Sequence, residues 1–329
     1  MNPFCQKWKG TLLPTAALIA LPLLFLVRAF AADACVAPKA GADVAQAPAG
    51  VDPTASLLSR LRPPSPDAIR SYVDSGAVSA RPYLLNAAQR AKVDDALRNL
   101  PALHRQKLHA HLRHLSFIDV PAGAGNGLTA VVNDGSFPVF DLTLRAGILN
   151  ESLAEFLTSK ERAIFADDGS GSTVTIDAPA NALDYVLLHE ATHIVDNVLA
   201  VTRKLDPRFT SSIWLDRTSL HPSWAKSPIA SNLFRRGPRI PISSAPGLYT
   251  SLVNSPFVSL YATAAAPEDF AELVAWREMS KRHRQPLTIT VRDNRGAVIH
   301  RTQPFDNDRF TRRFAAVDAL FGGCAARRR

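Results

Sequence analysis

The sequence has little cysteine, with three residues in a chain of 329. Cys5 lies in the N-terminal segment, whereas Cys35 and Cys324 lie near the two ends of the remaining chain. Two cysteines cannot form a Cys-rich zinc site, so a metal centre in this protein would need His and carboxylate ligands. In an oxidising compartment two alternatives stay open: a disulfide between Cys35 and Cys324 that ties the ends together, or two unpaired thiols.

Two signatures of nucleotide and nucleic-acid binding are also missing. The Gly-rich segment at residues 123–127 is not followed by Lys-Ser or Lys-Thr, so it predicts a loop and not a phosphate-binding loop. The basic clusters at residues 235–239, 281–284 and 327–329 are short and have no interleaved aromatic residues. We therefore expect solvated surface and no nucleic-acid partner, with weak attraction to anionic envelope surfaces as the alternative.

The N-terminus carries a long apolar run. Lys7 and Lys9 precede the run at residues 11–27, and small residues stand at Ala29 and Ala31. This pattern predicts that residues 1–31 are a signal peptide cleaved after Ala31, so that the protein is secreted or periplasmic. The alternative is an uncleaved anchor in the inner membrane, which would be the only membrane partner and would leave the rest of the chain facing outward.

The remaining chain is ordinary in composition, with 47% hydrophobic and 20% charged residues, which excludes wholesale disorder. Residues 32–66 are rich in Ala, Pro and Gly, so we predict a flexible linker there. We expect residues 67–329 to form one α+β domain with a small mixed sheet. Its first part, residues 67–201, and its last part, residues 257–329, flank an irregular excursion at residues 202–256 that is rich in Pro, Ser and Arg.

Periodicity and turn signals predict the elements of this domain. Helices are expected at residues 66–76, 86–100, 103–115, 151–165, 181–201, 266–282 and 307–321, and strands at residues 128–132, 137–144 and 173–177 and in a hairpin at residues 287–301. The helix at residues 103–115 has leucines spaced for one buried face and His104, His111 and His114 on another. A solvated basic face is the favoured interpretation of these histidines, and a second metal site is the alternative.

The segment LLHEATHIVD at residues 187–196 contains the motif HExxH. On a helix, His189 and His193 project from one face one turn apart, which lets both imidazoles bind a single tetrahedral zinc ion. Glu190 is adjacent to the first ligand and suits the role of a general base for a zinc-activated water. Apolar residues flank the motif, which predicts a buried helix with one polar edge facing a cleft.

A third protein ligand has to come from elsewhere in the chain. An extended form of the motif would need Gly and His where this sequence has Asp196 and Leu199, so we expect Asp196 to make only a supporting hydrogen bond. Glu268 and Glu272 are four residues apart on the helix at residues 266–282. One carboxylate would bind zinc and the other would accept the ring N–H of a ligating histidine. The alternative is a solvated acidic patch at the helix start.

These segments resemble the gluzincin branch of the zincin metallopeptidases, which includes thermolysin. HEATHIVD and YATAAAPEDFAE are most similar to the catalytic domain of anthrax lethal factor and related toxin-type peptidases, which carry HExxHxVD and later a Tyr seven residues before a Glu. The resemblance covers two short segments. It implies a zincin-like fold with an active-site helix and a C-terminal helical part that carries the third ligand.

The resemblance also implies a role for each site residue. His189, His193 and Glu268 would be the zinc ligands, with Glu190 as the base. Tyr261 would stabilise the developing oxyanion, and Glu272 would support a ligand. We therefore expect an exported zinc-dependent metallopeptidase that acts on a protein or peptide. A non-peptidase zinc hydrolase and a catalytically silent zincin-fold binding protein of the cell envelope are the alternatives.

Overall fold

The computed structural model describes residues 50–133, 135–283, 287–304 and 309–322. The expected signal peptide or anchor at residues 1–31 and both Cys35 and Cys324 lie outside these ranges. Among the described residues, the structure has no helix with the length and apolar character that crossing a bilayer requires.

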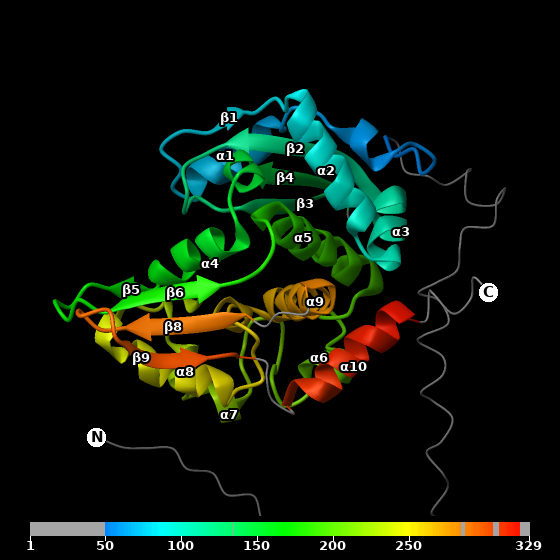
Figure 1. The fold of residues 1–329 in the computed structure, drawn as a ribbon. Coiled ribbons are helices and arrows are strands. Elements are labelled where there is room, and N and C mark those ends of the chain that lie inside the picture. The colour runs from blue at the N-terminus through cyan, green and yellow to red at the C-terminus, as the bar shows by residue number, and fades with distance from the viewer. Residues whose placement is uncertain (1–49, 134, 284–286, 305–308, 323–329) are drawn as a thin grey trace, which may run out of the picture.

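The upper layer in Figure 1 is a four-stranded sheet with the strand order β1-β2-β4-β3. Its strands are β1 (Arg81–Pro82), β2 (Leu112–Asp119), β3 (Gly127–Asn133) and β4 (Val139–Arg145). β2 pairs with β4 in parallel, whereas β3 pairs with β4 and β1 with β2 in antiparallel orientation. The sheet is therefore mixed, as expected for the α+β class, and β3 forms one of its edges.

Helix α5 (Ala182–Leu199) carries the HExxH motif and lies between this sheet and α9 (Ala266–His283). It begins at Asn181, whose side chain accepts a hydrogen bond of 2.8 Å from the backbone N–H of Asp184. It ends at Ala200, which adopts a left-handed φ of 55°. Most of its residues are buried, including Leu187, Leu188 and Ile194. The predicted buried helix with one polar edge is confirmed.

A second sheet contains β6 (Thr173–Asp177), β8 (Thr288–Arg292) and β9 (Val298–Thr302), all antiparallel. The hairpin β8–β9 confirms the prediction for residues 287–301. The helices around the two sheets are α1 (Pro66–Asp74), α2 (Ala87–Asn99), α4 (Leu153–Arg162) and α10 (Arg309–Gly322). One hydrophobic core, which extends from Leu57 to Val317, joins both sheets through α5.

The prediction of one helix at residues 103–115 is wrong. The structure has α3 (Ala102–His111), which is followed directly by β2 at Leu112. Leu112 and Leu115 were expected on the buried face of the helix, and in the structure they are buried in the strand. Both faces of β2 are covered, so its buried positions do not alternate as they do in a half-exposed strand. Spacing alone therefore did not distinguish the strand from another helical turn.

The histidines of this segment do not form a solvated basic face. His104 is fully buried, and its Nε2 lies 2.9 Å from Thr192 Oγ1. Because the Thr192 hydroxyl donates to Leu188 O at 2.7 Å, His104 Nε2 must carry the proton in this contact. His111 is also buried, and its Nδ1 lies 2.8 Å from Pro138 O. His114 lies on β2, 3.7 Å from Asp141. The three side chains thus lie in separate environments, two of them buried and that of His114 partly exposed.

The folded part of the chain begins earlier than predicted. Residues 57–60 form a 3-10 helix, and Arg60 is 5% exposed. Its guanidinium donates hydrogen bonds to the carbonyls of Leu108 and His109 at 2.8 Å each, near the C-terminal end of α3. The second half of the segment expected to be a linker at residues 32–66 is therefore packed onto the domain.

The excursion at residues 202–256 is more regular than predicted. It contains α6 (Pro207–Thr210), α7 (Pro222–Ala225), β7 (Ile240–Pro241) and α8 (Ala245–Val253), and β7 pairs with β5 (Phe165–Ala166). Each of these three helices has proline in its first two positions. The prolines that we interpreted as signs of irregular structure thus start short helices. Tyr249 on α8 donates a hydrogen bond of 2.8 Å to the buried Glu161.

The buried His104 predicts how the stability of the fold depends on pH. Burial, with a smaller effect from Arg282, lowers its pKa from 6.5 to about 3. As the pH falls below 6.5, the unfolded chain takes up a proton at this position that the folded chain does not, so stability is lost between these values. We expect His104→Phe to reduce the pH slope of the unfolding free energy by about 1.4 kcal/mol per pH unit between about pH 4 and 5.

Urea unfolding at several pH values measures this slope. The matched control is His221→Asn at the N-cap of α7, where the His221 side chain contacts Ser223 and asparagine can also cap the helix. An identical slope for the wild type and His104→Phe would show that His104 is protonated in the folded protein.

Candidate metal centre

His189 and His193 lie one turn apart on the polar edge of α5. Their ring centroids are 4.9 Å apart, and both side chains are largely shielded from solvent. Donor atoms of His189, Glu190 and His193 all lie within 4.8 Å of one another, so this group could hold a metal ion. The helical spacing predicted this proximity directly.

Glu268 approaches both imidazoles from the first turn of α9. Its Oε2 lies 3.1 Å from His189 Nε2 and 3.6 Å from His193 Nε2. Ligands about 2.05 Å from a tetrahedral metal ion are about 3.3 Å apart, so these two separations match the edges of such a site. The donor set of two imidazoles and one carboxylate is one that zinc accepts. The residues present therefore fit a metal ion of this kind.

Glu272 lies on the other side of the His189 ring. Its Oε1 is 3.1 Å from His189 Nδ1, in an ion-pair contact that is poorly aligned for a hydrogen bond. Tyr185 also donates to Oε1, and Ser259 Oγ donates to Oε2 at 2.5 Å. A carboxylate that is 1% exposed and held by this many donors has a fixed orientation. Glu272 therefore orients the ring of His189 and does not share the space between the two Nε2 atoms.

The electrostatics of the centre favour a cation between these groups. Burial opposes a charge on His189, but Glu268 and Glu272 outweigh it and raise its pKa to about 10. The pKa of His193 is also raised, since Glu268 outweighs burial there. Burial alone would raise the pKa of Glu268, yet the two imidazoles bring it well below its usual range. The carboxylates thus favour positive charge on both imidazoles, and a metal ion that binds here takes the place of any proton on its ligand nitrogens.

Glu190 turns toward the edge strand β3. Thr129 Oγ1 lies 2.7 Å from Glu190 Oε2 and 3.2 Å from the Glu190 carbonyl oxygen, so this hydroxyl fixes the carboxylate relative to its own helix. At Gly127, a Cβ atom would lie only 2.3 Å from Glu190 Oε1. These contacts have no local signal in the sequence, because Gly127 and Thr129 lie more than 60 residues before Glu190 in the chain.

Tyr261 lies on a 3-10 turn, Tyr261–Thr263, just before α9. Its ring centroid is 5.8 Å from that of His189. Burial, together with the negative charge of Glu268, raises the pKa of Tyr261 well above 10, so the phenol keeps its proton at neutral pH. The structure thus brings Tyr261 to the same centre as the two histidines and Glu268.

Two further side chains reach Tyr261 that the sequence did not indicate. The ring of Phe234, from the segment interpreted as an irregular excursion, lies 5.0 Å away in a T-shaped arrangement. Lys160 of α4 lies over the face of the Tyr261 ring, with Nζ 3.5 Å from its centroid. Residues from the excursion therefore form part of the wall of the centre.

Asp196 supports the helix and does not enter the centre. It is 2% exposed, and its carboxylate accepts hydrogen bonds from the backbone N–H of Thr202 at 2.7 Å and from Thr202 Oγ1 at 2.5 Å. These bonds fix the chain where it leaves α5 past the left-handed Ala200.

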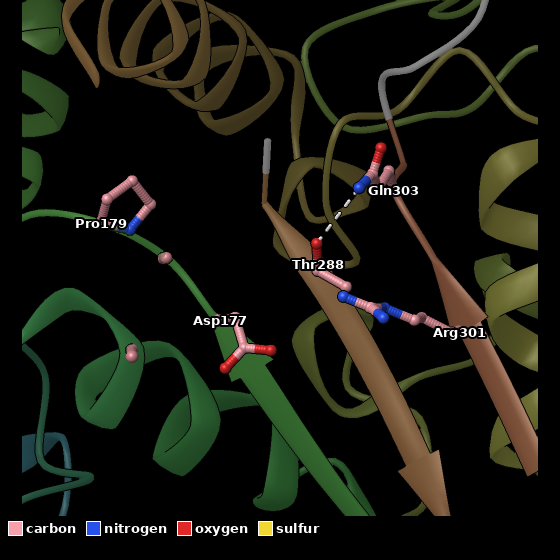
Figure 2. Close-up of a pocket in the computed structure, with 7 residues that line it drawn as sticks. Asp177, Pro179, Thr288, Arg301 and Gln303 are labelled. Carbon is pink, nitrogen blue, oxygen red and sulfur yellow. Dashed lines mark hydrogen bonds between the residues drawn. The ribbon is translucent and has the colours of Figure 1, made fainter. Parts of the chain in front are cut away.

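A cavity of about 460 Å³ lies elsewhere, between the start of α4 and the second sheet. Figure 2 shows Asp177 and Arg301 at its border and the hydrogen bond of 3.3 Å from Gln303 Nε2 to Thr288 Oγ1. None of the residues of the metal centre lines this cavity.

The close approach at Gly127 predicts a packing conflict. Gly127→Ala should lower the unfolding free energy by about 1–3 kcal/mol, because the new Cβ meets the Glu190 carboxylate. The matched control is Gly247→Ala in α8, where a Cβ meets nothing within 4 Å and where alanine should stabilise the helix by about 1 kcal/mol. Chemical denaturation measures both changes. Adding Glu190→Ala to Gly127→Ala should recover part of the lost unfolding free energy. If it recovers none, the new Cβ does not conflict with the Glu190 carboxylate.

No family model, no curated protein and no solved structure matches the chain. The functional argument therefore rests on the geometry of this centre.

Proposed function

We propose that the protein is an exported zinc-dependent peptidase with a zincin-like fold. The observation that carries this proposal is the convergence of His189, His193 and Glu268 from two helices, with Glu190 beside them. A solvated acidic patch would not account for a Glu268 oxygen within 3.6 Å of both imidazoles, which are largely shielded from solvent. Residues 1–31 supply the export signal in this proposal.

In this arrangement the three zinc ligands and the general base occupy separate positions. Glu268, not Glu190, is the third ligand, because its Oε2 contacts both Nε2 atoms while the Glu190 carboxylate is held by Thr129. A zinc ion held there would polarise a substrate carbonyl and make a water molecule acidic enough to attack it. Glu190 accepts a proton at its carboxylate and later gives it to the leaving amine.

Tyr261 supplies a proton donor at the same centre. Because its phenol stays protonated at neutral pH, it can donate a hydrogen bond to the oxygen on which negative charge develops. Glu272 keeps the His189 ring in the orientation that directs Nε2 toward Glu268 and His193.

The edge strand β3 favours an extended peptide as the substrate. It lies beside Glu190, and its outer edge pairs with no strand among the described residues. An extended chain can add to such an edge through main-chain hydrogen bonds, which would bring a peptide bond past Glu190. Val131 and Val132 near the end of β3 are more than 40% exposed, so apolar side chains are available on this strand.

Glu190→Gln tests the mechanism. The variant should hold as much zinc as the wild type, while kcat for peptide cleavage falls by about 10²- to 10⁴-fold, because the amide cannot accept the proton. The measurements are zinc content of the purified protein and cleavage of a peptide library. Glu278→Gln on α9, which pairs with Lys281 away from the centre, is the control and should leave both unchanged. Unchanged turnover in Glu190→Gln would exclude Glu190 as the base.

The roles of the two α9 carboxylates can be separated by zinc affinity. Glu268→Ala removes a ligand and should weaken zinc binding more than Glu272→Ala, which leaves all three proposed ligands in place and removes the carboxylate beside the His189 ring. Loss of such a partner costs about 10- to 100-fold in affinity. Competition with a chromogenic chelator measures both constants. A greater loss of zinc affinity in Glu272→Ala than in Glu268→Ala would mean that Glu272 is the ligand and Glu268 the supporting carboxylate.

A further inference from the structure

Lys160 occupies a position on α4 that should be apolar. The buried side chains of this helix include Leu153, Phe156 and Leu157, which precede Lys160 by seven, four and three residues. These are the spacings of one helical face, so Lys160 continues the face that packs inward. Its side chain is 16% exposed. Lysine is rarely buried to this extent without a charged or aromatic partner.

The partners of the Lys160 ammonium are two residues of the metal centre. Nζ lies 3.5 Å from the ring centroid of Tyr261 and 3.9 Å from Glu272 Oε1. The first contact has the geometry of a cation–π interaction, and the second is an ion pair with a buried carboxylate. Phe234 packs edge to face with Tyr261, and its ring centroid is 5.8 Å from the same ammonium.

A charge balance shows why a cation is needed here. Glu190, Glu268 and Glu272 bring three negative charges into a space where both histidines must be neutral to bind a metal ion. A divalent ion compensates two of these charges. Among the described residues, Lys160 is the one lysine or arginine within 4 Å of any of these three carboxylates, so its charge completes the balance.

We propose that Lys160 is a positioning residue of this centre, which orders the ring of Tyr261 through its ammonium and compensates the charge of Glu272. This role rests on the proposed function, because it acts through the phenol that assists the reaction. The ammonium on the ring face restrains the ring and withdraws electron density from it, so the phenol O–H becomes a stronger hydrogen-bond donor. Removal of the charge should therefore affect the chemical step more than substrate binding.

Kinetics of variants test the role. Lys160→Met keeps the length and removes the charge, and it should lower kcat between about 10- and 100-fold with KM within about threefold, because a displaced catalytic group slows the reaction to this extent. Lys160→Arg, which keeps a cation, should recover part of the loss. The control is Lys226→Met, since Lys226 is exposed in the loop after α7, and it should behave as the wild type.

A double-mutant cycle separates this role from a structural one. In a Tyr261→Phe background, Lys160→Met should change kcat by less than about threefold, because the hydroxyl through which Lys160 acts is already missing. The same loss in both backgrounds would overturn the proposal, as would an unchanged kcat in Lys160→Met alone.

A spectroscopic measurement makes the result independent of turnover. In protein labelled with fluorotyrosine, the ¹⁹F resonance of Tyr261, assigned by its absence in Tyr261→Phe, should shift or broaden in Lys160→Met but not in Lys226→Met. An unchanged resonance would show that Lys160 does not order the ring. A wild-type protein that holds zinc but cleaves none of the peptides would overturn the proposed function and the kinetic role, whereas the ¹⁹F measurement would still decide whether Lys160 orders Tyr261.

Discussion

The packing of α9 against α5 brings two pairs of polar side chains into one buried space. His189 and His193 face it from α5, and Glu268 and Glu272 face it from α9. Each helix alone would expose its pair to water. Once the helices pack, both imidazoles and both carboxylates lose solvent, and each group depends on the others for its charge and hydrogen bonds. The geometry of the centre follows from this one helix contact.

The surrounding elements hold the members of the centre in place. The edge strand β3 fixes Glu190 through Thr129 and leaves space for it at Gly127. The turn before α9 places Tyr261 against His189, and α4 places Lys160 on the ring of Tyr261. Three parts of the fold that are far apart in the chain thus restrain three different side chains. The contacts with these elements hold the side chains of the centre in defined positions.

Local patterns predicted many elements of the fold but failed where tertiary packing changes the meaning of a residue type. The hairpin of β3 and β4 and the helices α5 and α9 have local signals, so they were found. The first half of β2, residues 112–115, was predicted as the end of a helix, since its buried leucines do not alternate. Residues 32–66, which include Arg60, were predicted as a flexible linker, and residues 202–256 with their prolines as an irregular excursion. In the structure, Arg60 binds carbonyls near the end of α3 and the prolines start short helices.

The sequence by itself determined that His189 and His193 share one face of a buried helix, with Glu190 next to the first of them, because the spacing of side chains on a helix is a local property. It also determined that any metal ligands would be histidines and carboxylates. Only the tertiary structure decided that Glu268 faces both Nε2 atoms while Glu272 faces Nδ1 of His189, since this depends on how α9 is rotated against α5. The contacts of Thr129 and Lys160 were likewise decided by packing. Each joins residues more than 60 positions apart, for which the chain carries no local signal.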